Sequence, residues 1–111
     1  MLMRFSHPKA AAYLLEHGRV VTARVTRSQW SGRLDLLLDT ELELLKGRRK
    51  WLASCTEPFD LVDSLEFGLG SSGFGTIDEW LSALKGFGYQ AGQMVTFFEV
   101  TLDAPVKELA P

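Results

Sequence analysis

The sequence predicts an α+β domain in which a small β-barrel is flanked by two short helices. Three observations lead to this fold class. Strand-like segments outnumber helix-like ones, and the two kinds do not alternate in the regular order of a parallel β-α-β protein. The chain of 111 residues is 46% hydrophobic and shows no repeat, low-complexity tract or linker, so residues 1–111 are expected to form a single domain.

The N-terminal segment predicts a strand followed by a helix. The short apolar run MLMRF (1–5) is typical of a strand. In SHPKAAAYLLEHG (6–18), Ser6 or His7 is suited to the N-cap, and the proline that follows is suited to the first helical turn. Gly18 stands where a helix C-cap favours a residue that can adopt positive φ. We therefore expect a short helix between two strands.

The next segment, RVVTARVTR (19–27), alternates with a period of two. One predicted face carries Val21, Ala23 and Val25, and the other carries Val20, Thr22, Arg24 and Thr26. The simplest interpretation is a strand with one face in the core and the other reaching outward.

The centre of the chain allows more than one interpretation. LDLLLD (34–39) fits a strand or a buried helical turn, and its periodicity does not decide between them. In TELELLKGRRKWLASCTE (40–57), two apolar runs flank the turn-like KGRRK (46–50), which predicts a β-hairpin. A helix over 40–46 is the alternative, because Glu and Leu favour helices.

The C-terminal half predicts a loop, a helix and a last strand. EFGLGSSGFG (66–75) is a glycine-rich loop, and it lacks the Lys-Ser/Thr pair of a phosphate-binding P-loop. TIDEWLSALKGFG (76–88) begins with a capping box formed by Thr76 and Glu79 and ends at a glycine, which predicts a helix. QMVTFFEVTLDAPV (93–106) is expected to form the closing strand.

Charge is distributed unevenly along the chain. The net charge is −2, but residues 1–50 contain ten Lys and Arg against five Asp and Glu, whereas residues 51–111 contain two against nine. Such a chain can fold into a molecule with a basic face and an acidic back, or it can interleave the two halves and cancel them.

Composition also bears on location and on metal binding. No apolar run approaches the ~20 residues of a membrane span, and the N-terminal apolar stretch is too short for a signal peptide. The single cysteine, Cys55, cannot form an internal disulfide, which predicts a cytoplasmic protein. Cys55 lies in an apolar segment, so we expect its thiol to be buried and inert. His7 and His17 lie too far apart to form a ligand pair, so we expect no metal and no cofactor.

Several segments resemble ASCH domains, a family of the PUA-like superfamily. They are AAYLLEHGRVVTAR (11–24), the predicted hairpin LELLKGRRKWLASCTE (42–57) and SGFGTIDEWLSALKGFGYQAGQMVTFFEV (72–100). The resemblance covers about residues 3 to 102. It implies a small PUA-like barrel with a cleft lined by the early Gly-basic-Thr-Arg segment, and RNA, a nucleotide or a nucleoside as the partner.

Some ASCH members resemble amidohydrolases that remove acetyl from acetylated cytidine with a Lys, a Thr and a Glu. Thr22 matches the threonine and is therefore a candidate catalytic residue. The lysine position falls on Arg19, and an arginine does not act as a base. The glutamate position falls near Gly73, and Glu66 lies upstream of it. The resemblance therefore supports the fold and the cleft more than it supports catalysis.

We predict an RNA- or nucleotide-binding module with a basic cleft. Its candidate ligand-binding residues are Arg19, Thr22, Arg24, Thr26, Arg27, Trp30 and Arg33. Arginines hydrogen-bond phosphates in a fork, and aromatic rings stack on bases. The structural alternative is a polar strand face whose arginines pair with the acidic residues of the C-terminal half.

Two further functions remain open. One is an amidohydrolase or related hydrolase of modified nucleosides in the same cleft, and the other is a protein-interaction or dimerisation module whose acidic back and aromatic last strand meet a partner. KGRRK (46–50) is a second basic patch, suited to a nucleic-acid backbone or simply to a soluble turn. Four aromatic residues are expected in the core, namely Trp51, Trp80, Phe97 and Phe98. The sequence leaves the oligomeric state undetermined.

Overall fold

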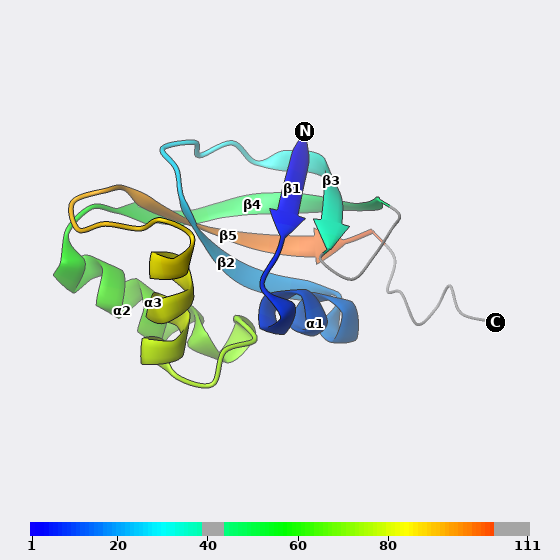
Figure 1. Cartoon of the computed structure of the whole chain (residues 1–111). Coiled ribbons are helices and arrows are strands. Elements are labelled where there is room, and N and C mark those ends of the chain that lie inside the picture. Colours follow the sequence, from blue (N-terminus) through cyan, green and yellow to red (C-terminus); the bar gives the residue numbers. More distant parts are fainter. Residues whose placement is uncertain (39–43, 104–111) are drawn as a thin grey trace.

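The computed structural model describes residues 1–38 and 44–103 and confirms the α+β class (Figure 1). Five strands, three α-helices and one short 3₁₀ helix follow one another in these residues. Their order is β1 (Leu2–Phe5), α1 (Pro8–His17), β2 (Arg19–Val25), β3 (Gly32–Leu38), β4 (Leu45–Cys55), α2 (Pro58–Gly68), η1 (Leu69–Ser71), α3 (Ile77–Gly86) and β5 (Val95–Leu102). None of these helices combines the length and apolar character that crossing a bilayer requires.

The strands form one sheet in the order β1-β3-β4-β5-β2. β1 runs parallel to β3, and the other neighbouring strands are antiparallel. β1 and β2 are the two edges and do not pair with each other in the described part of the chain. The sheet nevertheless curls until the guanidinium carbon of Arg24 on β2 lies 4.6 Å from the ring centroid of Phe5 on β1. The result is a half-barrel with an open seam between its edges.

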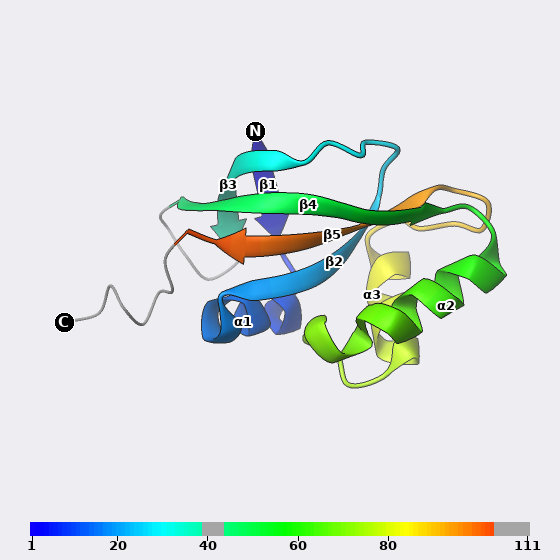
Figure 2. The ribbon, with the colours of Figure 1, turned by 180° about the vertical axis from the view of Figure 1, so that it is seen from behind.

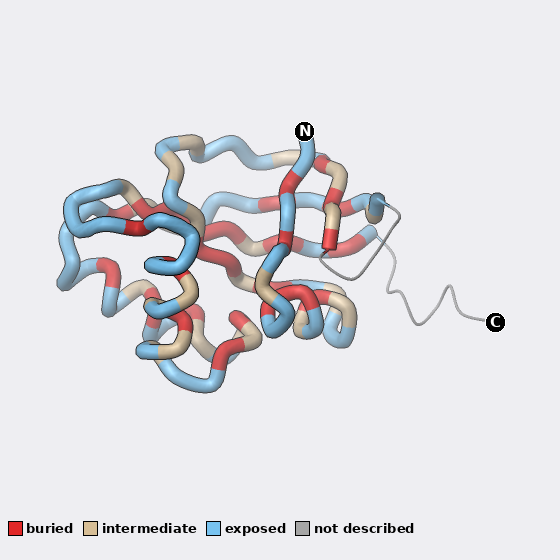
Figure 3. Tube along the Cα trace, viewed as in Figure 1, coloured by how far each residue is buried: buried red, intermediate tan, exposed pale blue. Residues whose placement is uncertain are grey.

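Strand register assigns each side chain to one of two faces, which we call inner and outer. Thr22, Phe98 and Trp51 lie in one cross-strand row on the inner face, which also carries the buried Phe5 and Leu36. Helix α1 packs against β1, β2 and β5 and contributes its buried residues to the core. Figure 3 shows this core as buried stretches that alternate with exposed ones along the strands.

Helices α2 and α3 cover only one end of the outer face (Figure 1). Trp80 of α3 meets Phe97 of β5 edge-on, with ring centroids 5.8 Å apart. Val21 of β2 approaches Gly68 at the end of α2, where a Cβ would lie 3.0 Å from the valine side chain. Seen from behind in Figure 2, the N-terminal half of β4 has no helix in front of it.

The predicted hairpin at KGRRK is wrong. β4 is one continuous strand of 11 residues, and the segment alternates between buried Gly47 and Arg49 and exposed Lys46, Arg48 and Lys50. A Cβ on residue 47 would lie 2.5 Å from the carbonyl oxygen of Thr101 on β5, so glycine here serves close strand approach and not a turn. The alternative helix over 40–46 is also wrong where it is described, since β4 begins at Leu45, and residues 40–43 lie outside the described part.

The strand interpretation of LDLLLD is confirmed by β3. Leu34, Leu36 and Leu38 are buried, whereas Asp35 and Leu37 are only partly buried. This alternation places three leucines on the inner face: Leu34 and Leu36 pair with β4, and Leu38 pairs with Phe5 on β1. Asp39, the last residue of the motif, lies outside the described residues.

Helix α2 is the element that the sequence analysis missed. The predicted fold has two helices, and the structure has a third between β4 and the glycine-rich loop. Its signals are present: Pro58 and Asp60 lie in its first turn, and Leu61 and Leu65, one turn apart, are both buried. The first three residues of the predicted loop of 66–75 belong to this helix, which ends at Gly68.

The other two helices begin and end as predicted. His7 caps α1 by accepting a hydrogen bond from the Lys9 amide, and Gly18 ends it at φ +74°. Thr76 caps α3 by accepting from the Glu79 amide at 3.1 Å. These local interactions explain why both helices could be located from short motifs.

β2 alternates as predicted, but its centre has no outward face. Val20 and Thr22 are buried on the inner face, and Ala23 is buried on the outer one. The prediction of one core face and one exposed face is therefore wrong at the centre of the strand, because helices and the curled sheet cover both sides. Thr22 is a buried hydroxyl, 7% exposed.

Candidate ligand cavity at the sheet seam

A cavity of about 260 Å³ lies at the open seam between β1 and β2. We call it the seam cavity. It is lined by Arg4, Phe5, Ser6, His7, Ala10, Thr22, Ala23, Arg24, Val25, Phe74, Trp80, Ala83, Leu84 and Phe87. This lining includes two arginines, a histidine, two hydroxyls and four large aromatic rings, and it includes no carboxylate. Its chemistry suits a ligand that carries a negative charge and an apolar or aromatic part.

Arg24 is the charged group held most firmly in the cavity. Its Nε donates a hydrogen bond to Thr22 Oγ1 at 3.0 Å, and its guanidinium lies over the Phe5 ring. No carboxylate of the described residues lies within ion-pair distance of it. Burial, and secondarily the positive charge of Arg49, lower the pKa of Arg24 to about 10, so it stays charged at neutral pH with little solvation.

Arg49 supplies a second buried guanidinium on the inner face. It is 6% exposed, and it donates hydrogen bonds to the Trp30 carbonyl at 2.8 Å and to Ser28 Oγ at 3.1 Å. Its guanidinium also lies 4.2 Å from the Phe98 ring centroid. Among the described residues it too has no ion-pair partner, and burial lowers its pKa. Because Phe98 is the register partner of Thr22, Arg49 raises the positive potential near the cavity.

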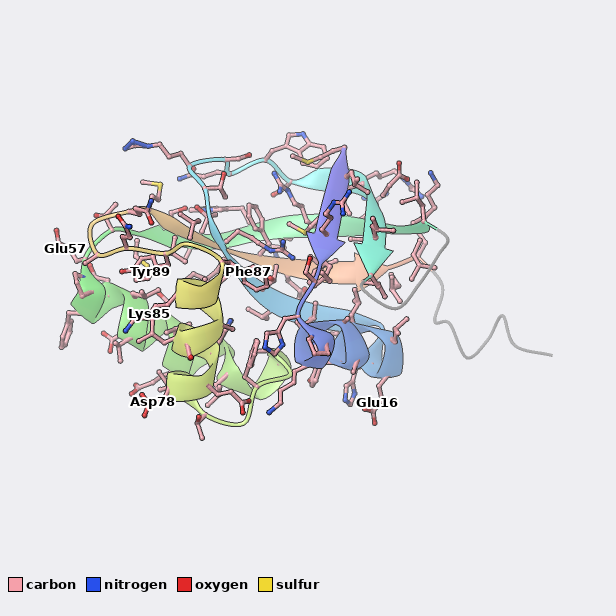
Figure 4. All side chains as sticks on the ribbon, viewed as in Figure 1. Glu16, Glu57, Asp78, Lys85, Phe87 and Tyr89 are labelled. Carbon is pink, nitrogen blue, oxygen red and sulfur yellow. The ribbon has the colours of Figure 1, made fainter. Side chains whose placement is uncertain are left out.

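Aromatic rings form the opposite wall. The rings of Phe74 and Trp80 are nearly parallel, with centroids 6.0 Å apart, and the His7 ring lies 4.7 Å from that of Phe74. Phe87, just after the last turn of α3, is 61% exposed and is labelled in Figure 4. An exposed ring at the rim of a cavity is a surface on which a planar ligand can stack.

Only two of the seven predicted ligand-binding residues line this cavity, namely Thr22 and Arg24. Arg19 lies on the outer face, 3.9 Å from Glu99, and Arg33 forms an ion pair with Asp103 at 2.8 Å. These two arginines therefore pair with acidic residues of the C-terminal half, which was the alternative to a ligand-binding role.

The remaining three predicted residues lie on the loop after β2. Thr26 Oγ1 accepts a hydrogen bond from the Ser28 amide, and its carbonyl accepts one from the buried Thr96 hydroxyl at 2.7 Å. Arg27 is exposed beside a separate shallow hollow, and Trp30 is 43% exposed, with its ring 5.1 Å from the Arg49 guanidinium. The loop thus packs over Arg49 and not around the seam.

The residues that the ASCH resemblance implies for catalysis do not come together. Arg19 and Thr22 point to opposite faces of β2, as residues three apart on a strand must. A Cβ at Gly73 would lie 2.5 Å from the Lys9 carbonyl oxygen, so a glutamate does not fit there. Glu66 is exposed on α2 and does not line the cavity. Among the lining residues, His7 is the only conventional proton acceptor, and its Nδ1 already accepts from the Lys9 amide.

The cavity residues that the sequence analysis did not single out come from segments far apart in the chain. Arg4 and Phe5 lie on β1, Phe74 precedes α3 and Phe87 follows it. The buried position of Arg49 was also missed, because this residue lies in the segment that was wrongly predicted as a turn. No sequence signal separates Arg49 from the basic Arg48 and Lys50 on either side of it, because its burial is visible only in the structure.

Five other residues singled out from the sequence are placed clearly. Trp80, Phe97 and Phe98 are buried as expected, whereas Trp51 is 39% exposed, so its predicted core position is wrong. Cys55 is a buried free thiol, and burial raises its pKa. No group of three or more potential metal ligands occurs in the described ranges.

Comparisons with known proteins add no assignment: no protein-family model, curated protein or solved structure matches this chain.

Proposed function

We propose that this protein binds a nucleotide in the seam cavity, either free or as part of an RNA strand. The observation that carries the proposal is Arg24, a partly buried guanidinium that faces a cavity without a lining carboxylate. Its Nε is engaged by Thr22, and no described acceptor binds its terminal nitrogens. These nitrogens are the natural donors for two phosphate oxygens, because a guanidinium binds phosphate in a fork.

The size and walls of the cavity favour one nucleotide. Its volume of about 260 Å³ is slightly below the ~300–1,000 Å³ that drug-sized ligands occupy. A base would lie against the exposed ring of Phe87, with the phosphate near Arg24 and Arg4. The second buried arginine, Arg49, adds attraction for an anion in a site that water screens poorly.

We further propose that the half-barrel is a PUA-like fold of ASCH type, working as a binding module in the cytoplasm. Thr22 at the cavity agrees with the resemblance, and the unpaired thiol of Cys55 agrees with a reducing compartment. Hydrolysis of an acetylated cytidine has less support, since Arg19 points away from Thr22 and no carboxylate lines the cavity.

The test is a titration of the protein with nucleoside monophosphates and with the matching nucleosides. Binding is measured by calorimetry and by changes in amide chemical shifts. We expect the monophosphates to bind and to shift residues 4–7, 22–25 and 87. Arg24→Gln should weaken binding about tenfold or more, because each charge-assisted hydrogen bond contributes about 1.5–3 kcal/mol.

The matched control is Arg27→Gln, which removes an exposed arginine three residues further along that does not line the cavity. It should change the affinity less than about twofold, since exposed charges contribute little. Equal losses in both variants, or shifts confined to other surfaces, would refute nucleotide binding at the seam. Thermal unfolding of Arg24→Gln separates a binding defect from a folding defect.

A further inference from the structure

The outer face of the sheet carries a second basic cluster, which the seam cavity does not involve. Its cations are Arg19, Arg33, Lys46, Arg48 and Lys50, and we call it the outer basic face. The side chains of Arg19, Arg33 and Lys46 are 60%, 66% and 70% exposed. No described helix covers this half of the face, as Figure 2 shows for the N-terminal half of β4.

Register places these cations in two crossing rows centred on Arg48. Across the sheet, Arg33 pairs with Arg48, Arg48 pairs with Thr101, and Thr101 pairs with Arg19. Neighbouring strands lie about 4.8 Å apart, so three arginines and a hydroxyl share one line over four strands. Along β4, Lys46 and Lys50 flank Arg48 at steps of about 6.8 Å, the distance between alternate residues of a strand.

The directly opposed Arg33 and Arg48 are unfavourable for the sheet itself. Like charges in such cross-strand pairs destabilise it. Carboxylates lie beside the cluster: Arg33 pairs with Asp103, Arg19 with Glu99 and Lys46 with Asp35. Glu99 is also the cross-strand register partner of Lys50, so Arg48 is the cation at the centre that carboxylates neutralise least. Within the described residues, Arg48 and Lys50 have no ion-pair partner. An external anion would neutralise the centre of the cluster.

We propose that the outer basic face binds the sugar-phosphate backbone of a polynucleotide. A chain of regularly spaced phosphates matches cations arranged in rows, and Arg, Lys and Thr are the usual side chains in backbone contacts. A protein partner fits less well, because interfaces between proteins are centred on aromatic and aliphatic anchors. The neighbours of Arg48 in the two rows are Arg33, Thr101, Lys46 and Lys50, none of which provides such an anchor.

The face would bind without base specificity. Exposed Arg and Lys side chains recognise charge and spacing, and no aromatic ring lies within the two rows. Binding should therefore depend steeply on salt. Single strands lose affinity with a log–log slope of about −0.7 per phosphate contact, so four contacts predict a slope near −3.

The experiment measures fluorescence anisotropy of a labelled oligouridine of about 20 nucleotides between about 50 and 300 mM salt. The test variant is Arg48→Ala/Lys50→Ala. The control is Arg27→Ala/Lys85→Ala, which lowers the net charge equally but changes exposed cations outside the two rows. We expect the test variant to bind at least about tenfold more weakly with a slope reduced by about 1.4, and the control to change about twofold or less.

Two outcomes would overturn the proposal. If oligouridine binding weakens equally in the two variants, only the net charge of the protein matters. If poly-glutamate binds tightly and the test variant loses that affinity too, the partner is an acidic protein. Failure of the cavity proposal remains distinguishable. If nucleoside monophosphates bind Arg24→Gln as well as the wild type, while Arg48→Ala/Lys50→Ala still weakens oligouridine binding, the cavity proposal fails and the outer basic face stands.

Discussion

Arg48 and Arg49 are adjacent in the chain and have opposite environments. Arg48 projects from the outer face into solvent, whereas Arg49 is 6% exposed and lies over the Phe98 ring with hydrogen bonds to the loop of residues 26–31. These two adjacent residues of β4 therefore differ in role: Arg48 is available to a ligand, whereas Arg49 stabilises the fold.

This pair gives the first prediction. Arg49→Ala should lower the free energy of unfolding by about 2–3 kcal/mol, because it leaves the Trp30 carbonyl and Ser28 hydroxyl without their charged donor. Arg48→Ala should change it by less than about 0.5 kcal/mol, or raise it slightly by removing the opposed Arg33 pair. Urea unfolding of both variants measures the difference, and equal effects would contradict the assigned faces.

Gly47 is expected to tolerate no side chain. A Cβ there would lie 2.5 Å from the Thr101 carbonyl oxygen and 2.9 Å from Leu36 Cδ1, so Gly47→Ala should destabilise the protein by about 1–3 kcal/mol, as overpacking does. Gly86→Ala is the control, since nothing lies within 4 Å of a Cβ at that position in α3. It should be neutral or stabilising by up to about 1 kcal/mol. A shift in the urea midpoint for Gly86 as large as for Gly47 would rule out this packing.

Glu79 should make part of the stability pH-dependent. Hydrogen bonds from Lys9, first, and from the Gly75 amide hold the pKa of the Glu79 carboxyl below its usual range. A depressed pKa stabilises the fold above the unfolded value of about 4.3, and this contribution is lost as the pH falls further. The wild type should therefore exceed Glu79→Gln in stability at pH 6, and the gap should shrink below about pH 4.

The control for this titration is Glu66→Gln. Glu66 is exposed on α2 and forms no ion pair with another described residue. Thermal unfolding at pH 6 should show little difference between Glu66→Gln and the wild type, since exposed charges contribute little to stability. If the difference in stability between the wild type and Glu79→Gln stays the same at every acid pH, the ion pair between Lys9 on α1 and Glu79 on α3 contributes nothing to stability.

Cys55 should react slowly with thiol reagents while the protein is folded. Burial raises the pKa of its thiol, so little thiolate forms near the usual value of about 8.5, and the sulfur is also shielded. We expect the rate to rise more than about tenfold in denaturant and to become similar to that of a small thiol. Rapid modification of the folded protein at pH 8 would place the thiol at the surface.

The sequence predicted those parts of the fold that depend on local interactions. The capped helices around Pro8 and Thr76 and the β-branched run at Arg19 were located because their signals lie within a few residues. β4 was misassigned because Gly47 resembles a turn residue until its approach to Thr101 on a distant strand is known. α2 was missed because it runs into the glycine-rich segment and its two buried leucines, Leu61 and Leu65, span only one helical turn.

The candidate site was predictable only in part for the same reason. Thr22 and Arg24 could be selected from their strand, but the partners Phe5 and Phe87 are contributed by other elements. Pairing of Arg19 and Arg33 with Glu99 and Asp103 likewise depends on the sheet order. The charge pattern indicated a basic half of the chain, and only the topology separates it into an inner pair of guanidiniums and an outer basic face.

The position of β5 has a consequence for how the chain is made. Among the described strands β2 pairs only with β5, and β5 also joins β4, so this C-terminal strand lies between two earlier ones. A nascent chain leaving the ribosome therefore holds β2 without a partner until residues 95–102 emerge. During that interval the edge of β2, with its apolar Val20 and Val21, is open to aggregation, and a chaperone that shields this strand should raise the yield of folded protein.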